Sequence, residues 1–234
     1  MTAPWFFIED LPVAGGAVHI PRDEARHALG SKRLGPGDEL TLFDGRGGVS
    51  TGRIGADRTT DGSVSVAVGP RRESPPQKPR IHLGTAIPKG DRFGTLIEVV
   101  ASMGVAEFTA LDCERSVVSL SDALRARAER LSIEACKQSR NAWLPAISGP
   151  TPLAQWVQQQ RQRGLEVIAA DPSGAAIGAV TADCSLAIGP EGGFSPAELM
   201  AMRTTGVRMA SLGSNILRIE LAACALLAAA RIPR

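Results

Sequence analysis

The stretch that most constrains the fold is residues 186–220, in which two strand–loop–helix units follow one another. Residues 185–188 (SLAI) have the length and apolar content of a buried strand, and residues 207–212 read as a second one. Each run leads into a glycine-containing loop, residues 189–193 (GPEGG) and residues 212–215 (LGSN), and each loop precedes a helix. Strand–helix alternation of this kind predicts a parallel α/β sheet.

The first of these helices has a complete N-terminal capping signature in its sequence. Ser195 suits the N-cap, Pro196 suits the first helical position, and Glu198 stands three residues after the cap. Gly206 is expected to end the helix. If the two strands are parallel neighbours, both loops lie at the carboxyl edge of one sheet, where α/β proteins bind ligands. The alternative is that both loops are only connecting turns.

The first loop also narrows the class of ligand. It is not a phosphate loop, because no Lys-Ser/Thr pair follows the glycines, and the dinucleotide-binding spacing is absent. A helix N-terminus attracts an anion, so the carboxylate of an amino-acid-like ligand fits there. Glu191 could equally take that position from within the protein. Adjacent glycines at 192 and 193 allow a ligand or another backbone to come close.

The same alternation begins near residue 81 and continues to the last helix. Strands are expected at residues 81–86, 107–111 and 166–170, and the end of the third should reach the same edge as the two loops. Helices are expected after Asp91, from about Asp122 to Ser139, and after Pro152. Residues 216–230 are apolar on almost every side, which predicts burial against the core or a second subunit. The segment is too short to span a membrane.

Residues 1–72 have a different pattern. Short β-branched or alternating runs at residues 38–44, 50–54 and 63–68, with a helix at residues 23–34, predict a small barrel. Residues 73–79 are rich in proline and read as a linker. We therefore expect two domains, residues 1–72 and 80–234.

Bulk properties exclude few functions. The formal charge of +2 is too small to argue for RNA binding. The four cysteines are widely spaced, with no CxxC pair, so neither a metal site nor a disulfide framework is expected. The apolar residues 5–8 run directly into Glu9 and Asp10, unlike a signal peptide, which predicts a cytoplasmic protein.

Taken in order, the motifs of the chain resemble the RsmE family of SPOUT-class methyltransferases. The matching segments cover nearly the whole chain: residues 188–195 (IGPEGGFS), 212–213 (LG), 216–220 (ILRIE), 88–91 (PKGD), 114–117 (ERSV), 135–139 (ACKQS) with Pro145, and His27 with residues 37–38 (GD) and 43–45 (FDG). The resemblance implies an α/β fold, in which a C-terminal parallel-sheet domain with a trefoil knot follows an RNA-binding PUA-like β-barrel. It also implies a homodimer that uses S-adenosylmethionine to methylate N3 of a uridine in the 16S ribosomal RNA of the small ribosomal subunit.

Carried over residue by residue, the resemblance assigns a set of cofactor-binding residues, largely through their backbone groups. These are Ala169, Ala170, Gly189, Pro190, Gly192, Gly193, Leu212, Gly213, Ile216 and Leu217. The candidate phosphate contacts of the N-terminal domain are Arg22, Arg26, Lys32 and Arg33. The alternative for these four is a solvated helix face.

Three charged residues are candidates for catalysis. Methylation requires loss of the uracil N–H proton or stabilisation of the resulting anion, and we expect Arg218 to supply the stabilising cation. Glu191 and Glu220 are unranked candidates for the base or for orienting Arg218. The structural alternative is that Glu191 caps its own loop, Glu220 stabilises the N-terminus of the last helix, and Arg218 pairs with either.

Six positions depart from the usual residues of the family by losing a polar or charged group. They are Trp5, Val99, Ser102, Asn141, Asn215 and Leu221. These departures motivate a second hypothesis, a catalytically weakened paralogue that binds ribosomal RNA without methylating it. A third is an α/β enzyme that uses another nucleoside ligand.

Overall fold

The computed structural model describes residues 3–31, 33–58 and 62–231. By their internal contacts the residues form two compact units. The first comprises Met1–Pro76 and Cys136–Leu144, and the second comprises Gln77–Ala135 and Pro145–Arg234. The domain limits expected from the sequence, residues 1–72 and 80–234, remain a proposal.

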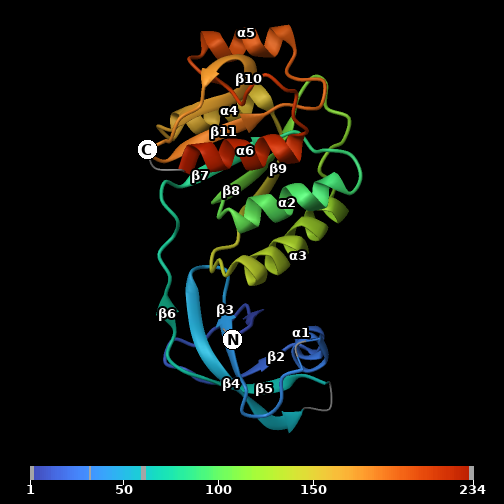
Figure 1. The fold of residues 1–234 in the computed structure, drawn as a ribbon, viewed down its shortest axis with the longest axis vertical. Coiled ribbons are helices and arrows are strands. Elements are labelled where there is room, and N and C mark those ends of the chain that lie inside the picture. Colours follow the sequence, from blue (N-terminus) through green and yellow to red (C-terminus); the bar gives the residue numbers. More distant parts are fainter. Residues whose placement is uncertain (1–2, 32, 59–61, 232–234) are drawn as a thin grey trace. The chain divides into compact units, whose positions relative to one another are not determined.

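The first unit is built on a six-stranded, mostly antiparallel sheet (Figure 1). Its strands run in the order β1-β3-β4-β5-β2, with β6 paired to β4, and β1 and β3 form its parallel pair. Alternate residues of these strands bury an aliphatic core around Phe6, Leu40 and Val66. The strands are β1 (Trp5–Phe7), β2 (Gly16–Ile20), β3 (Glu39–Phe43), β4 (Gly48–Arg58), β5 (Val64–Val68) and β6 (Arg72–Glu73).

The helix of this unit is shorter than its sequence suggested. In place of one helix over residues 23–34, α1 (Arg22–Arg26) passes into a π-helical turn, His27–Ser31. Gly30 lies within this turn, and glycine weakens a regular helix because it loses the most conformational freedom on ordering.

A segment from much later in the chain completes the first unit. The backbone N–H of Leu144 donates to Gly45 O (2.9 Å), and Trp143 Nε1 donates to Ser74 O (2.9 Å). Lys137 Nζ lies 2.9 Å from the carboxylate of Glu24. By these contacts residues 136–144 belong to the first unit, although nothing in their sequence indicated this.

The second unit contains a parallel six-stranded sheet in the order β12-β10-β11-β7-β8-β9. Its strands are β7 (Ile81–Thr85), β8 (Glu107–Asp112), β9 (Ala146–Pro152), β10 (Glu166–Ala176), β11 (Cys184–Ile188) and β12 (Arg208–Ser211). Two details differ from the expectation. β9 was not expected, since its sequence (AISGPTP) has little strand character, and β11 and β12 are not neighbours because β10 lies between them.

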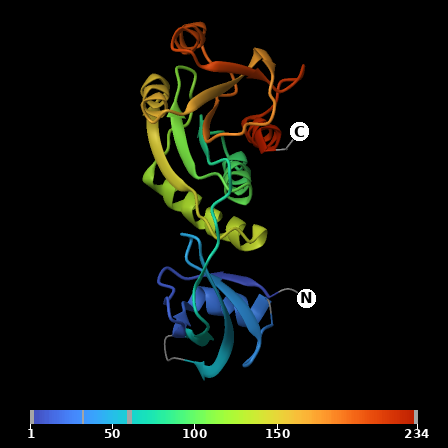
Figure 2. The ribbon, with the colours of Figure 1, turned by 90° about the vertical axis from the view of Figure 1, so that its left-hand side faces the viewer.

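Helices cover both faces of this sheet, and Figure 2 shows α4 and α6 on opposite sides of it. The helices are α2 (Arg92–Ser102), α3 (Asp122–Ser139), α4 (Leu153–Gln162), α5 (Pro196–Thr204) and α6 (Ile219–Arg231). The pleat of β11 explains the two cores. Leu186 and Ile188 join the core under α2 and α6, whereas Ala187 joins the one under α4 and α5. The continuous apolar run of this strand thus serves both faces.

The last helix, α6, buries one side and exposes the other. Ala223, Leu226 and Leu227 are fully buried against the sheet, whereas Leu221 is 53% exposed and Cys224 is exposed. Burial on every side, expected from its composition, is therefore not reached within a single chain. Among the described residues, no helix is both long and apolar enough to cross a bilayer.

Candidate active site

The site is formed where three neighbouring parallel strands end or leave the sheet. In β10, Ala170 pairs in register with Ala210 of β12, and Ala169 pairs with Ala187 of β11. The loops after β11 and β12 therefore emerge on either side of the β10 backbone. The shared carboxyl edge is what the sequence predicted, although the interposed strand was not.

A pocket of about 290 Å³ opens at this edge, close to the lower end of the roughly 300–1,000 Å³ usual for small-molecule sites. It is lined by Ala170, Asp171, Pro172, Ile188, Gly189, Pro190, Glu191, Gly192, Gly193, Phe194, Leu212, Gly213, Asn215, Ile216, Leu217, Ile219 and Ala222. Of the ten residues predicted to bind the cofactor, nine belong to this lining. The other, Ala169, is fully buried in β10, directly before Ala170.

The first loop is a hydrogen-bonded turn. The N–H of Gly193 donates to Pro190 O (2.8 Å), and Gly193 has φ of +70°, in the left-handed region that favours glycine. Glycine is needed at position 189 for a different reason. A Cβ at this position would lie 3.1 Å from the backbone N of Phe194, whose buried ring folds back under the turn. Gly189 therefore makes room for the protein's own Phe194.

The start of α5 follows this turn as predicted. Glu198 N donates to Ser195 Oγ (3.2 Å), and Ser195 N donates to Glu198 Oε2 (2.7 Å), which is a complete capping box. Pro196 occupies the first turn. The capping box fixes the direction in which the chain leaves the pocket.

The second loop is more exposed than the first. Gly213 has φ of +115°, and its N–H donates to Ser211 Oγ (3.3 Å). Ile216, which lines the pocket, is 92% exposed.

No hydrogen bond or ion pair joins the three residues predicted to be catalytic in the described part of the chain. Glu191 lines the pocket and pairs with Arg92, the two charged groups lying 3.2 Å apart. Arg218 is exposed and has no side-chain hydrogen bond or ion pair within the described part of the chain. Glu220 is 5% exposed, and its Oε2 finds no hydrogen-bond partner among the residues that the structure describes. The predicted alternative in which Arg218 pairs with either glutamate is not observed.

Two arginines that contact the first loop were not predicted to belong to the site. Arg92 begins α2 and reaches Glu191, and Arg115 follows β8 and donates from Nη1 to Gly192 O (2.7 Å). A signal for both was present, because Arg92 directly follows the motif at residues 88–91 and Arg115 lies within the motif at residues 114–117. Those motifs carried the family resemblance without any assigned function.

The RNA-contact candidates lie in the first unit. Arg22 and Arg26 of α1 are exposed, as is Arg33, whose φ is +54°. Lys32 lies outside the described residues. The exposed arginines are consistent with both the phosphate-contact and the solvated-face interpretations.

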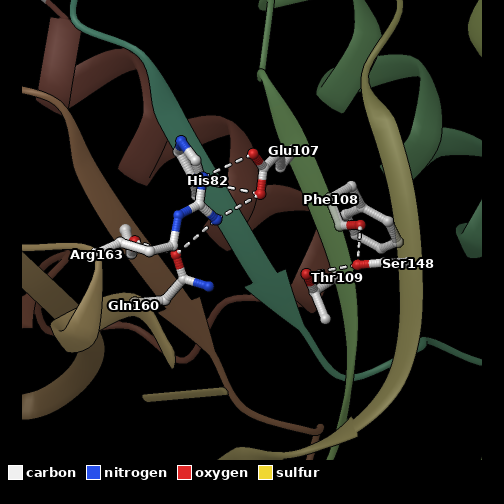
Figure 3. A network of polar contacts seen from close by, with 8 residues as sticks. His82, Glu107, Phe108, Thr109, Ser148, Gln160 and Arg163 are labelled. Carbon is white, nitrogen blue, oxygen red and sulfur yellow. Dashed lines mark hydrogen bonds and ion pairs between the residues drawn. The ribbon is translucent and has the colours of Figure 1, made fainter. Parts of the chain in front are cut away.

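A contrasting polar cluster lies at the amino edge of the parallel sheet (Figure 3). Arg163 forms a bidentate pair with Glu107, at 2.7 and 2.8 Å, and the buried ring of His82 places Nδ1 3.1 Å from Glu107 Oε2. Gln160 of α4 accepts a hydrogen bond from Ser185 Oγ (3.1 Å). Burial lowers the pKa of His82 against the opposing pull of the Glu107 charge, so its ring is neutral in the folded protein at neutral pH.

Other features of the second unit are less suited to chemistry. A larger cavity, about 930 Å³, lies between α4 and α5, but aliphatic side chains dominate its lining and its Glu198 is already engaged in the capping box. Burial raises the pKa of the Cys113 thiol to about 12 and that of Cys184 to about 11, so neither is a thiolate nucleophile near neutral pH. The described residues contain no group of three or more metal-ligating side chains.

Comparison with known families gives matches to both units. Residues 75–231 match the model of an RNA methyltransferase domain, and residues 20–59 match that of an RNA methyltransferase PUA domain. A relative from Mycobacterium bovis, named ribosomal RNA small subunit methyltransferase E, is 31% identical over 98% of this chain and 91% of its own length. A relative of the same name from Synechocystis is 30% identical over 80% of this chain and 63% of its own length.

Solved structures give the same result for the fold. A methyltransferase from Legionella pneumophila, described in complex with the bound cofactor SAM, has a TM-score of 0.84 and 28% identity, covering 97% of this chain and 96% of that one. A ribosomal RNA small subunit methyltransferase E from Neisseria gonorrhoeae, bound to S-adenosyl methionine, has a TM-score of 0.85 and 25% identity, with the same coverage. The predicted fold class, a parallel-sheet α/β domain with a PUA-like N-terminal domain, is confirmed, while the trefoil knot stays a prediction.

Proposed function

Because the chain belongs to the RNA methyltransferase family, we propose that it uses S-adenosylmethionine to methylate N3 of a uridine in 16S ribosomal RNA. The observation that carries this proposal is the pocket around the ends of β10, β11 and β12. Two relatives with the same fold are described with S-adenosylmethionine bound. RNA as the substrate class is supported by the PUA match over residues 20–59.

The residues of the pocket fit the proposed cofactor. Gly189, Gly192, Gly193 and Gly213 present backbone rather than side chains to the cavity, which suits recognition of a flat adenosine by main-chain groups. The carboxylates of Asp171 and Glu191 in the lining suit a ligand that carries positive charge. Bound there, S-adenosylmethionine would supply an electrophilic methyl group on a sulfonium.

The chain's own groups would prepare the acceptor. A uracil imide loses its proton near pH 9–10, in the same range as Tyr, and a nearby cation favours the deprotonated form. Arg218 follows the pocket-lining Leu217 and is exposed, so its guanidinium is free to reach a carbonyl oxygen of a uracil at the pocket mouth. Glu191 is better placed than the enclosed Glu220 to accept the proton, because it lines the pocket.

The remaining parts of the proposal concern the assembly. The exposed apolar side of α6, with Leu221 and Cys224, supports a homodimer that covers this helix. Arg22, Arg26 and Arg33 are proposed to contact RNA phosphates from the PUA-like domain, with Lys32 as a fourth contact outside the described residues. The cytoplasm, where ribosomal subunits are assembled, is the proposed location.

The test is transfer of a labelled methyl group. The purified protein is incubated with labelled S-adenosylmethionine and either small ribosomal subunits or free 16S ribosomal RNA, and the RNA is digested to nucleosides. Label in N3-methyluridine supports the proposal. Label in another nucleoside, or no label from a protein that binds the cofactor, contradicts it.

One observation favours the second candidate, a weakened paralogue that binds ribosomal RNA without methylating it. Of the six departures from the family pattern, Asn215 lines the pocket. The others lie elsewhere: Trp5 packs on Phe43, Asn141 bonds to Trp143, Val99 and Ser102 lie in α2, and Leu221 is exposed on α6. RNA binding with no detectable label would support this candidate.

A further inference from the structure

Two loops that lie far apart in the sequence are joined beside the pocket. Glu114 N donates to Glu198 Oε1 (2.9 Å), and the same carboxylate, through Oε2, accepts the N–H of Ser195 in the capping box. One residue further along, Arg115 Nη1 donates to Gly192 O (2.7 Å). The segment after β8 is therefore bonded to the turn that lines the pocket and to the start of α5.

The bond from Arg115 holds one particular peptide group. In the peptide between Gly192 and Gly193, the C=O accepts a hydrogen bond from Arg115, while the N–H donates to Pro190 O (2.8 Å). A peptide between two glycines rotates easily, because neither residue has a Cβ to restrict φ and ψ. With both ends bonded, this peptide has one defined orientation at the wall of the pocket.

The side chain of Glu191 on the same turn is also held by a residue of another element. Arg92, the first residue of α2, lies 3.2 Å from it, and both side chains are only about one-third exposed, at 32% and 35%. In the sheet, β7 lies next to β11 and β8 lies next to β7. The segments that follow β7 and β8 thus each contribute one arginine to the turn that follows β11.

We propose that Arg115 is a positioning residue for the cofactor, acting by orienting the Gly192–Gly193 peptide, and that Arg92 assists by holding Glu191. This inference rests on the proposed function in so far as the ligand of the pocket is S-adenosylmethionine. Arg115 is not in the lining of the pocket. It acts through the backbone of the turn, and its loss should change cofactor affinity before it changes the chemistry.

The first experiment needs no cofactor. Amide hydrogen exchange is followed by mass spectrometry in the free protein and in Arg115→Ala, comparing peptides over residues 189–194 with peptides over residues 208–218. We expect faster exchange only in the first segment, because Gly193 N–H loses its defined partner when the peptide rotates. Equal exchange rates in both proteins would overturn the proposal.

The second experiment uses S-adenosylmethionine and ribosomal RNA. We expect Arg115→Ala to raise the Kd and KM for S-adenosylmethionine about 5- to 10-fold, with kcat at saturating cofactor and the KM for RNA within two-fold of wild type. Arg115→Lys retains one donor and should recover most of the affinity. Arg208→Ala, which removes an exposed ion pair with Glu166 at the other edge of the sheet, is the matched control and should change neither constant.

The outcomes separate this proposal from the proposed function. A higher KM for RNA with unchanged cofactor affinity would make Arg115 an RNA contact and overturn the positioning role. A wild-type protein that binds S-adenosylmethionine and loses affinity in Arg115→Ala, yet transfers no methyl group, would support the positioning role while contradicting the proposed activity. A wild-type protein that does not bind S-adenosylmethionine would overturn both.

Discussion

The two edges of the parallel sheet differ in the groups that form them, which are mainly paired side chains at one edge and the backbone of turns at the other. At the amino edge, side chains bond to one another: Arg163 pairs with Glu107 (Figure 3), Arg208 with Glu166, and Gln160 with Ser185. At the carboxyl edge, the backbone of glycine-rich turns surrounds a pocket, and the exposed Arg218 has no side-chain partner within the described residues. The amino edge thus holds strands in place, whereas the carboxyl edge, where Arg92 and Arg115 hold one turn, leaves the guanidinium of Arg218 available for a ligand.

This division leads to a general expectation for substitutions. Changes at the carboxyl edge should alter binding or turnover while leaving stability nearly unchanged, and changes at the amino edge should do the reverse.

The largest effect is expected for Arg218→Ala. Loss of a cation that stabilises developing negative charge typically costs about 100-fold in turnover or more. We expect kcat to fall on that scale, while calorimetry should give a Kd for S-adenosylmethionine within a few-fold of wild type, because Arg218 is not in the lining of the pocket. An unchanged rate would remove Arg218 from the mechanism.

The next largest effect is expected on cofactor affinity, in a comparison of substitutions at two adjacent glycines. Gly193→Ala places a side chain on a residue with φ of +70°, a conformation that costs an L-residue about 1–2 kcal/mol. We expect the free turn to relieve this strain by rotating, so that cofactor binding must restore the left-handed conformation and cofactor affinity falls roughly 10-fold. Gly192→Ala is the matched control, since its Cβ would meet Arg115 Cδ at 3.5 Å, an ordinary contact. Equal losses in the two variants, measured by calorimetry, would show that space rather than backbone conformation limits the turn.

At the amino edge, Arg163→Gln should change stability instead. It removes a bidentate pair whose side chains are 43% and 31% exposed, so we expect a loss of about 1 kcal/mol or less, a decrease in Tm of roughly 2–4 °C. Methyl transfer at a temperature well below Tm should stay within two-fold of wild type. A loss of activity without a change in Tm would contradict the division between the two edges.

The smallest effect is expected for the dependence of folding stability on pH. Because burial lowers the pKa of His82, the unfolded chain binds a proton near pH 6.5 that the folded protein does not, and stability falls as pH decreases through that range. The hydrogen bond from Arg163 lowers the pKa of Glu107, so its contribution is lost only below the ordinary value of 4.5. Urea unfolding of wild type at pH 7.5 and 5.5 should show this decrease, and His82→Gln should show less of it. Equal pH dependence in both proteins would exclude His82 as its source.

Much of the fold followed from local sequence. The apolar run before Gly189 and the Ser195–Pro196–Glu198 signature predicted β11 and the start of α5. These features are set by neighbours within a few residues, through strand propensity and end capping. β9 and the contacts of residues 136–144 with the first unit were missed for the opposite reason, because they depend on partners distant in the chain.

The site divides in the same way. The glycines of the sequence and its resemblance to a family already indicated which two loops form the pocket, and named Arg218, Glu191 and Glu220 as the charged residues to test. Only the tertiary structure decided that Glu191 pairs with Arg92, that Glu220 is enclosed, and that Arg115 holds the Gly192–Gly193 peptide. The physical reason is that turn conformation is encoded locally, whereas the partner of a long charged side chain depends on which strands are neighbours in the sheet.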